Sequence, residues 1–129
     1  MALTTYVEAI RQGIWEEMER DKRVFILGED VGVYGGAFKV TEGMLAKFGE
    51  DRVIDTPISE SAIVGAAIGM SMNGLLPVCE MQFIDFITCA FDQITSYAAK
   101  SRYRWGVGVP LVVRGPCGGN VHGGPFHSA

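Results

Sequence analysis

Short hydrophobic runs alternate with helical stripes along the chain. The continuous apolar run over residues 24–27 is typical of a strand buried on both faces of a parallel sheet, and further strands are predicted over residues 53–54, 76–81 and 109–113. Between them, apolar residues recur at helical spacing over residues 6–20, 41–48, 61–74 and 83–98. This alternation predicts an α/β domain with a largely parallel sheet and helices on both faces.

Local signals mark the ends of these predicted helices. Thr5 and Glu8 have the spacing of a capping box at the start of the first helix. Gly49 should end the short helix over residues 41–48. For the helix over residues 61–74, we expect Pro57 in the first turn, a cap from Thr56 or Ser59, and a left-handed stop at residues 73–74.

The helix over residues 61–74 contains no charged residue. It is too short to span a bilayer, so we expect it to be buried in protein. Its small residues Ala62, Gly65, Ala66 and Gly69 share one face, which permits close approach of another helix, either within the domain or in another chain. Glu60 stands at its start, either as an acid that the helix dipole stabilises or as a carboxyl group that shares a proton in apolar surroundings.

Composition narrows the classes of function. The 129 residues correspond to one domain, and 48% are hydrophobic. A net charge of −4 without a basic run argues against a nucleic-acid or membrane-surface partner. Three cysteines without a C-x-x-C spacing, and no secretory signal pattern, favour reduced thiols in a cytoplasmic protein. A glycine-rich segment follows the last predicted strand, so we expect a truncated piece of a longer protein.

Candidate chemistry gathers where the predicted strands end, which is where open parallel sheets bind ligands. The candidates are Glu29 and Asp30 after the first strand, Glu60 after the second, Gln82, Phe83 and Phe86 after the third, and His122 and His127 after the fourth. Phe83, Phe86 and Phe91 are by default core residues. The glycine loop over residues 32–36 lacks a phosphate-binding pattern, and the two histidines lack metal-site spacing, so we predict no metal site in this chain.

Several blocks together carry a family resemblance: LGEDVG (27–32), DTPISE (55–60), MQFIDF (81–86), FDQI (91–94), LVVR (111–114) and HS (127–128). The chain resembles the beta subunit of the thiamine-diphosphate-dependent decarboxylating component of 2-oxo acid dehydrogenase complexes, of the pyruvate dehydrogenase type. The resemblance implies that residues 1–129 are an N-terminal fragment: a transketolase-like pyrimidine-binding domain with the thiamine-diphosphate-binding fold, lacking the second, C-terminal domain of the family.

The resemblance also implies roles for individual residues. Glu60 would hydrogen-bond the aminopyrimidine ring nitrogen, so that the ring can remove the thiazolium carbon proton. Phe86 would stack on the pyrimidine, with Gln82 and Ile58 beside the cofactor. Glu29 would belong to an acidic proton path, and His127 would stabilise intermediates or assist acyl transfer. The chain departs from the family at Ala129, where relatives usually carry glutamine.

The same resemblance implies partners. The family's G-D-G and N-N motif for diphosphate and magnesium is absent, so an alpha subunit should hold both groups in an α2β2 heterotetramer that also meets a lipoyl-bearing acyltransferase. The favoured function is oxidative decarboxylation of pyruvate, with branched-chain 2-oxo acid or acetoin dehydrogenase as alternatives. A non-catalytic flavodoxin-like binding module is a different class, and so is a hydrolase that uses Glu29 and Asp30, although adjacent extended residues usually point apart.

Overall fold

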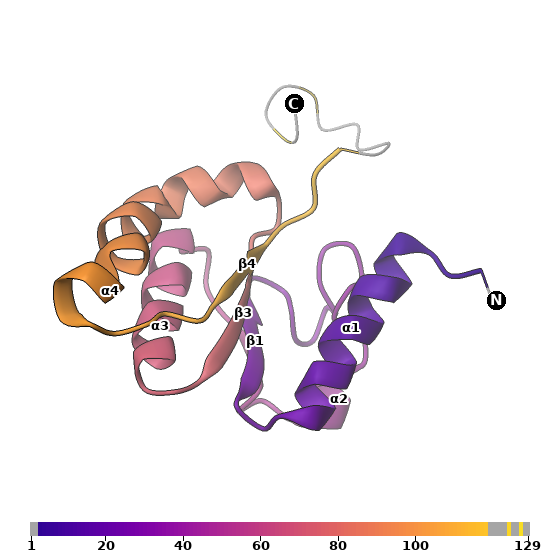
Figure 1. Cartoon of the computed structure of the whole chain (residues 1–129). Helices are drawn as coiled ribbons and strands as arrows, with labels where there is room; N and C mark the ends of the chain where they lie inside the picture. The colour runs from indigo at the N-terminus through magenta and orange to yellow at the C-terminus, as the bar shows by residue number, and fades with distance from the viewer. Residues whose placement is uncertain (1–2, 119–123, 125–126, 128–129) are drawn as a thin grey trace.

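Four parallel strands form the centre of the protein in the computed structural model, which describes residues 3–118, 124 and 127 (Figure 1). The strands are β1 (Val24–Gly28), β2 (Val53–Asp55), β3 (Leu76–Glu80) and β4 (Val112–Arg114), in the spatial order β2-β1-β3-β4. All three pairings are parallel, and Gly28 lies in register with both Asp55 and Glu80. The carboxyl ends of the strands therefore meet at one edge of the sheet.

Helices cover both faces of this sheet, as the sequence predicts. On one side lie α1 (Tyr6–Arg20) and α2 (Met44–Phe48), and on the other lie α3 (Glu60–Met72), η1 (Ile84–Ala90), η2 (Gln93–Ala98) and α4 (Ala99–Trp105) (Figure 1). Alternate residues of β1 enter the two cores: Val24 and Ile26 pack with residues of α1 and α2, whereas Phe25 and Leu27 pack with α3. The predicted doubly covered parallel sheet is confirmed.

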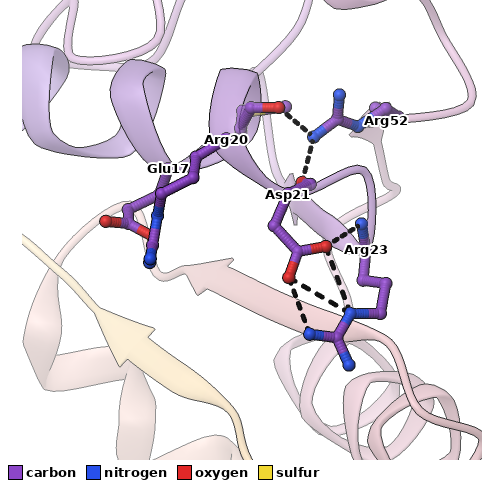
Figure 2. A network of polar contacts seen from close by, with 6 residues as sticks. Glu17, Arg20, Asp21, Arg23 and Arg52 are labelled. Atoms are coloured by element: carbon purple, nitrogen blue, oxygen red, sulfur yellow. Dashed lines mark hydrogen bonds and ion pairs between the residues drawn. The ribbon is translucent and has the colours of Figure 1, made fainter.

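The amino ends of the strands are fastened to α1 by Arg52. Its guanidinium donates to the carbonyl oxygens of Met18 (2.7 Å), Asp21 (3.0 Å) and Val24 (3.0 Å), beside the ion pair of Asp21 with Arg23 (Figure 2). The bond to Met18 satisfies a carbonyl group in the last turn of α1, and the bond to Val24 reaches the first residue of β1. At the other end of α1, the predicted capping box of Thr5 and Glu8 is present.

The start of α3 differs from the prediction. The helix begins at Glu60, so Pro57 precedes it, and the Ser59 hydroxyl donates to the Pro57 carbonyl (3.0 Å) instead of capping the helix. The Thr56 amide donates to the Gly28 carbonyl (2.9 Å), which keeps this segment attached to β1 and delays the helix. The predicted end at residues 73–74 is confirmed, with Gly74 at φ +89°. In the described part of the chain, no helix combines the length and hydropathy needed to cross a bilayer.

Three other predicted elements change in extent or type. The helix expected over residues 83–98 is a 3₁₀ segment, then a π segment, then α4, and the π segment brings the Gln93 side chain close against Gly65 of α3. The helix expected from residue 41 begins at Met44, after Gly43 at φ +82°. β4 is shorter than expected because the Pro110 carbonyl accepts from the Ser71 hydroxyl (3.1 Å) rather than joining the ladder.

An apolar groove of about 920 Å³ runs between α1 and the strands β3 and β4, of which β4 lies at the edge of the sheet. Val78 and Val112 line it from the sheet, Ile10 and Ile14 line it from α1, and Arg114 lies in its wall. Val112 is 55% exposed there. Within the described residues, no helix covers this part of the sheet.

Candidate functional site

Two carboxyl groups meet at the amino end of α3. Glu29, directly after β1, is only 5% exposed, and Glu60 is half-buried in the first turn of the helix. The Glu29 carboxylate accepts from the Ser59 amide (3.3 Å). Burial, followed by the negative charge of Glu60, raises the pKa of Glu29 above its usual value, while the Ser59 hydrogen bond opposes the rise. The amino end of α3 therefore brings together two carboxyl groups, of which Glu29 is the more buried and the harder to ionise than a free glutamate.

Asp55 fastens the loop after β1 to the segment that leads into α3. Its carboxylate accepts from the backbone amides of Gly32 (2.6 Å) and Val33 (3.1 Å). A Cβ atom at Gly32 would lie 2.6 Å from an oxygen of that carboxylate, so only glycine fits this approach. The loop that follows Glu29 is consequently fixed relative to the helix that carries Glu60.

A second link joins the end of β1 to the end of β3. Asp30 adopts the left-handed backbone conformation, with φ +57°, and its carboxylate accepts from the Gln82 amide nitrogen (2.9 Å). The Asp30 carbonyl accepts from the Gly36 amide (2.8 Å) across the loop. Gln82 thereby connects the acidic residues to the aromatic residues that follow it in the chain.

The aromatic part of the site centres on Phe83. His127 stacks on the Phe83 ring with a centroid distance of 4.5 Å and an interplanar angle of 18°. Phe86 meets the rings of Phe83 (6.0 Å) and His127 (5.4 Å) edge-on, and Phe38 meets Phe83 in the same way (5.6 Å). Nδ1 of His127 is buried without a hydrogen-bond partner among the described residues. The default expectation that Phe83 belongs to the core of its helix misses this role.

An ion pair of Glu80 with Arg114 lies beside the site, at the ends of β3 and β4. Their side chains are 3% and 15% exposed. Burial raises the pKa of Glu80, and the Arg114 guanidinium works against that rise. The chain passes close above this pair, since a Cβ atom at Gly36 would lie 3.2 Å from a Glu80 oxygen. The pair is not foreseen from the sequence; the signal that could have found it is a glutamate that interrupts an apolar strand.

The structure thus groups most of the predicted site residues. Glu29 lies beside Glu60, and Phe86 lies against His127. Ile58 is 82% exposed, and its contact with a cofactor stays a prediction. His122 lies outside the described residues.

The comparison that decides the family covers nearly the whole chain: the pyrimidine-binding domain of transketolase matches residues 3–129. The chain belongs to this family. It is 55% identical over 99% of its length to 2-oxoisovalerate dehydrogenase subunit beta of Bacillus subtilis and 49% identical over 96% to that of Pseudomonas aeruginosa. It is 47% identical over 99% to pyruvate dehydrogenase E1 component subunit beta of Staphylococcus aureus. The chain spans 40%, 36% and 40% of the length of these three relatives.

Proposed function

We propose that residues 1–129 are the N-terminal, pyrimidine-binding part of the beta subunit of a thiamine-diphosphate-dependent 2-oxo acid dehydrogenase. The complete subunit would act with an alpha subunit in oxidative decarboxylation and transfer of the acyl group to a lipoyl arm. The observation that carries the proposal is the placement of Glu60 beside the buried Glu29 at the start of an uncharged helix. The family and the relatives named above support it.

The residues at this edge of the sheet fit the pyrimidine half of the cofactor. Glu60 offers a carboxyl group for a nitrogen of the pyrimidine ring. The side-chain rings of Phe83 and Phe86 offer apolar surface for the face of that pyrimidine. Thr56 Oγ1 and His127 Nδ1 are buried polar atoms that find no partner among the described residues, as expected where a polar ligand completes the site. The acidic group around Glu29 would repel a diphosphate, so magnesium and diphosphate would be held by the alpha subunit.

When bound, thiamine diphosphate would supply a nucleophilic thiazolium carbon and a cationic ring able to take up an electron pair. The role of Glu60 is to hold a proton at the aminopyrimidine ring nitrogen. Glu29 would lie on the proton path to Glu60, because burial and the neighbouring Glu60 charge raise its pKa and so make protonation easier than at an exposed glutamate. Phe86 would fix the plane of the ring, and His127 would donate a hydrogen bond to the substrate.

The outward face of α3 fits a subunit interface. Ala62, Ala66 and Gly69 are exposed on it, and no charged residue lies between Glu60 and Asn73. Small exposed residues permit a second helix to approach closely, which favours contact with another subunit. We infer an α2β2 assembly in the cytoplasm, with a lipoyl-bearing acyltransferase as a further partner.

Two substrates remain in competition. Pyruvate is the substrate expected from the sequence motifs. The higher identity to the two 2-oxoisovalerate dehydrogenase subunits (55% and 49%, against 47%) favours a branched-chain 2-oxo acid as a second candidate. In either case, the residues that select the substrate would come partly from the alpha subunit.

Co-purification and binding test the proposal. The full-length subunit should co-purify with a partner that carries the G-D-G and N-N motif, and the complex should bind thiamine diphosphate in the presence of magnesium. The present chain alone should show no magnesium-dependent binding by calorimetry. Decarboxylation should then be measured with pyruvate and with 3-methyl-2-oxobutanoate. A complex that binds no thiamine diphosphate, or micromolar binding by the isolated chain, would contradict the proposal.

A further inference from the structure

We propose that Asp30 is a positioning residue: it orients the Gln82 amide so that its carbonyl oxygen, Oε1, is presented to the ligand as a hydrogen-bond acceptor. The inference rests on the proposed function, because it assumes that a ligand with N–H groups occupies the site beside Gln82. It concerns a residue that the family resemblance leaves without a role.

The chemistry of the contact fixes the orientation of the amide. An ionised carboxylate can only accept hydrogen bonds, so the group of Gln82 that faces Asp30 must be its NH₂. Their contact of 2.9 Å has the geometry of such a bond. Oε1 is attached to the same planar carbon and is directed away from Asp30. Within the described ranges, no residue donates to Oε1, so the acceptor is available.

Asp30 is itself held in place at a conformational cost. Its φ of +57° is in the left-handed region, which aspartate tolerates better than most residues but which still carries strain. The Gly36 amide bonded to the Asp30 carbonyl and the Asp55 carboxylate bonded to the Gly32 amide keep the loop in this shape. Strained residues that neighbours hold firmly are typical of functional sites, where they pre-organise a group for binding.

The consequence is a specific recognition rule. Gln82 should recognise an N–H donor, such as the exocyclic amino group of an aminopyrimidine, and should disfavour a ligand that presents a carbonyl oxygen there. Without Asp30 the amide can rotate, and it loses this selectivity.

Nuclear magnetic resonance of the glutamine side chains tests the orienting contact without any cofactor. The sequence contains only three glutamines: Gln12, Gln82 and Gln93. Gln12 donates to Glu16 and Gln93 donates to Asp92, so both serve as internal references. In the ¹⁵N-glutamine-labelled chain, Asp30→Gly should move one Gln82 amide proton to the position of a free amide and leave the references unchanged. Lys39→Gly, at a loop position with φ +62°, should move none of the three.

Affinity for thiamine diphosphate in the complex with the alpha subunit provides the second test. Asp30→Gly should raise the dissociation constant about fivefold to tenfold, corresponding to one lost hydrogen bond. Asp30→Asn, whose amide can either accept or donate and so only partly fixes the orientation of Gln82, should raise it by a smaller factor than Asp30→Gly. The double variant Asp30→Gly with Gln82→Ala should bind no more weakly than Gln82→Ala alone.

The outcomes separate the two proposals. A wild-type complex that does not bind thiamine diphosphate overturns the proposed function, while the amide resonances still decide the contact of Asp30 with Gln82. Unchanged Gln82 resonances in Asp30→Gly overturn the positioning role. A wild-type complex that binds, together with an unchanged dissociation constant in Asp30→Gly, also overturns it.

Discussion

Removal of the Asp55 carboxylate should loosen the loop that follows Glu29. Two backbone amides, those of Gly32 and Val33, donate to this carboxylate at 2.6 and 3.1 Å. A hydrogen bond to a charged group contributes about 1.5–3 kcal/mol to stability. Because Asp55 lies at the surface, where water can replace the lost partner, each bond should contribute only about 1–1.5 kcal/mol, at or below the lower end of this range. Asp55→Ala should therefore lower the free energy of unfolding by about 2–3 kcal/mol.

Two matched variants examine the same link. Asp55→Asn keeps one accepting oxygen and should lose about half as much stability. Gly32→Ala would place a Cβ atom 2.6 Å from the carboxylate oxygen and should displace the carboxylate, with a loss similar to that of Asp55→Ala. Since both changes break the same contact, the double variant should be little worse than either alone.

Urea unfolding followed by circular dichroism measures these losses. For a domain of this size, a loss of 2–3 kcal/mol shifts the midpoint by about 1–2 M. A loss below about 0.5 kcal/mol in Asp55→Ala would show that the loop is held by other contacts. Strict additivity of the Gly32 and Asp55 variants would refute the shared contact.

Three further predictions concern pH, thiol reactivity and stability. The pKa of Glu29 is raised in the folded state, so its ionised form opposes folding, and at pH 7 Glu29→Gln should unfold at higher urea than wild type. This advantage should vanish as the pH falls through the folded pKa to below 4.5. An advantage independent of pH would contradict the reasoning. Burial raises the pKa of the Cys79 thiol to about 12, so a disulfide reagent should label the two exposed cysteines in the folded chain and Cys79 only after unfolding; rapid labelling of all three would refute its burial. Arg52→Met removes a donor from the carbonyls of Met18, Asp21 and Val24, of which Asp21 keeps the Val24 amide, and should cost about 2–4 kcal/mol. Arg23→Met, which removes an exposed ion pair, should cost less than about 1 kcal/mol, and equal midpoints in urea would contradict this contrast.

The sheet and its coverage were predictable because their signal is local. Apolar runs such as residues 24–27 and helical stripes such as residues 6–20 report burial directly from residue spacing. The start of α3 was not predictable. Ser59 and Pro57 carry a strong local preference for a helix start, and long-range contacts override that preference. The Thr56 amide is already bonded to the Gly28 carbonyl, and the carboxylate of Glu29 accepts from the Ser59 amide in place of a capping side chain.

The candidate site divides in the same way. Residues at strand ends, such as Glu29 and Glu60, could be placed together from the parallel topology alone. Pairings between strands that are distant in sequence, such as Asp30 with Gln82 or Glu80 with Arg114, depend on strand order and register. The sequence contains no local signal for strand order or for register.

Glu60, as the group that would hold a proton at the pyrimidine, is the residue on which the proposed function depends most directly. Glu60→Gln in the full-length, partner-bound enzyme keeps the shape and the hydrogen-bonding capacity of the side chain but cannot share a proton. The measurement is the rate at which the thiazolium carbon proton of bound thiamine diphosphate exchanges with deuterium, beside the dissociation constant of the cofactor. Glu16→Gln, an exposed glutamate on α1, is the control.

Glu60→Gln should slow this exchange by about 10²–10⁴-fold, whereas the dissociation constant should change little, since the diphosphate would be held by the other subunit. The Glu16→Gln complex should behave as wild type in both respects. An exchange rate in Glu60→Gln close to that of wild type would contradict the account, because Glu60 would then be only an acid at the start of a helix.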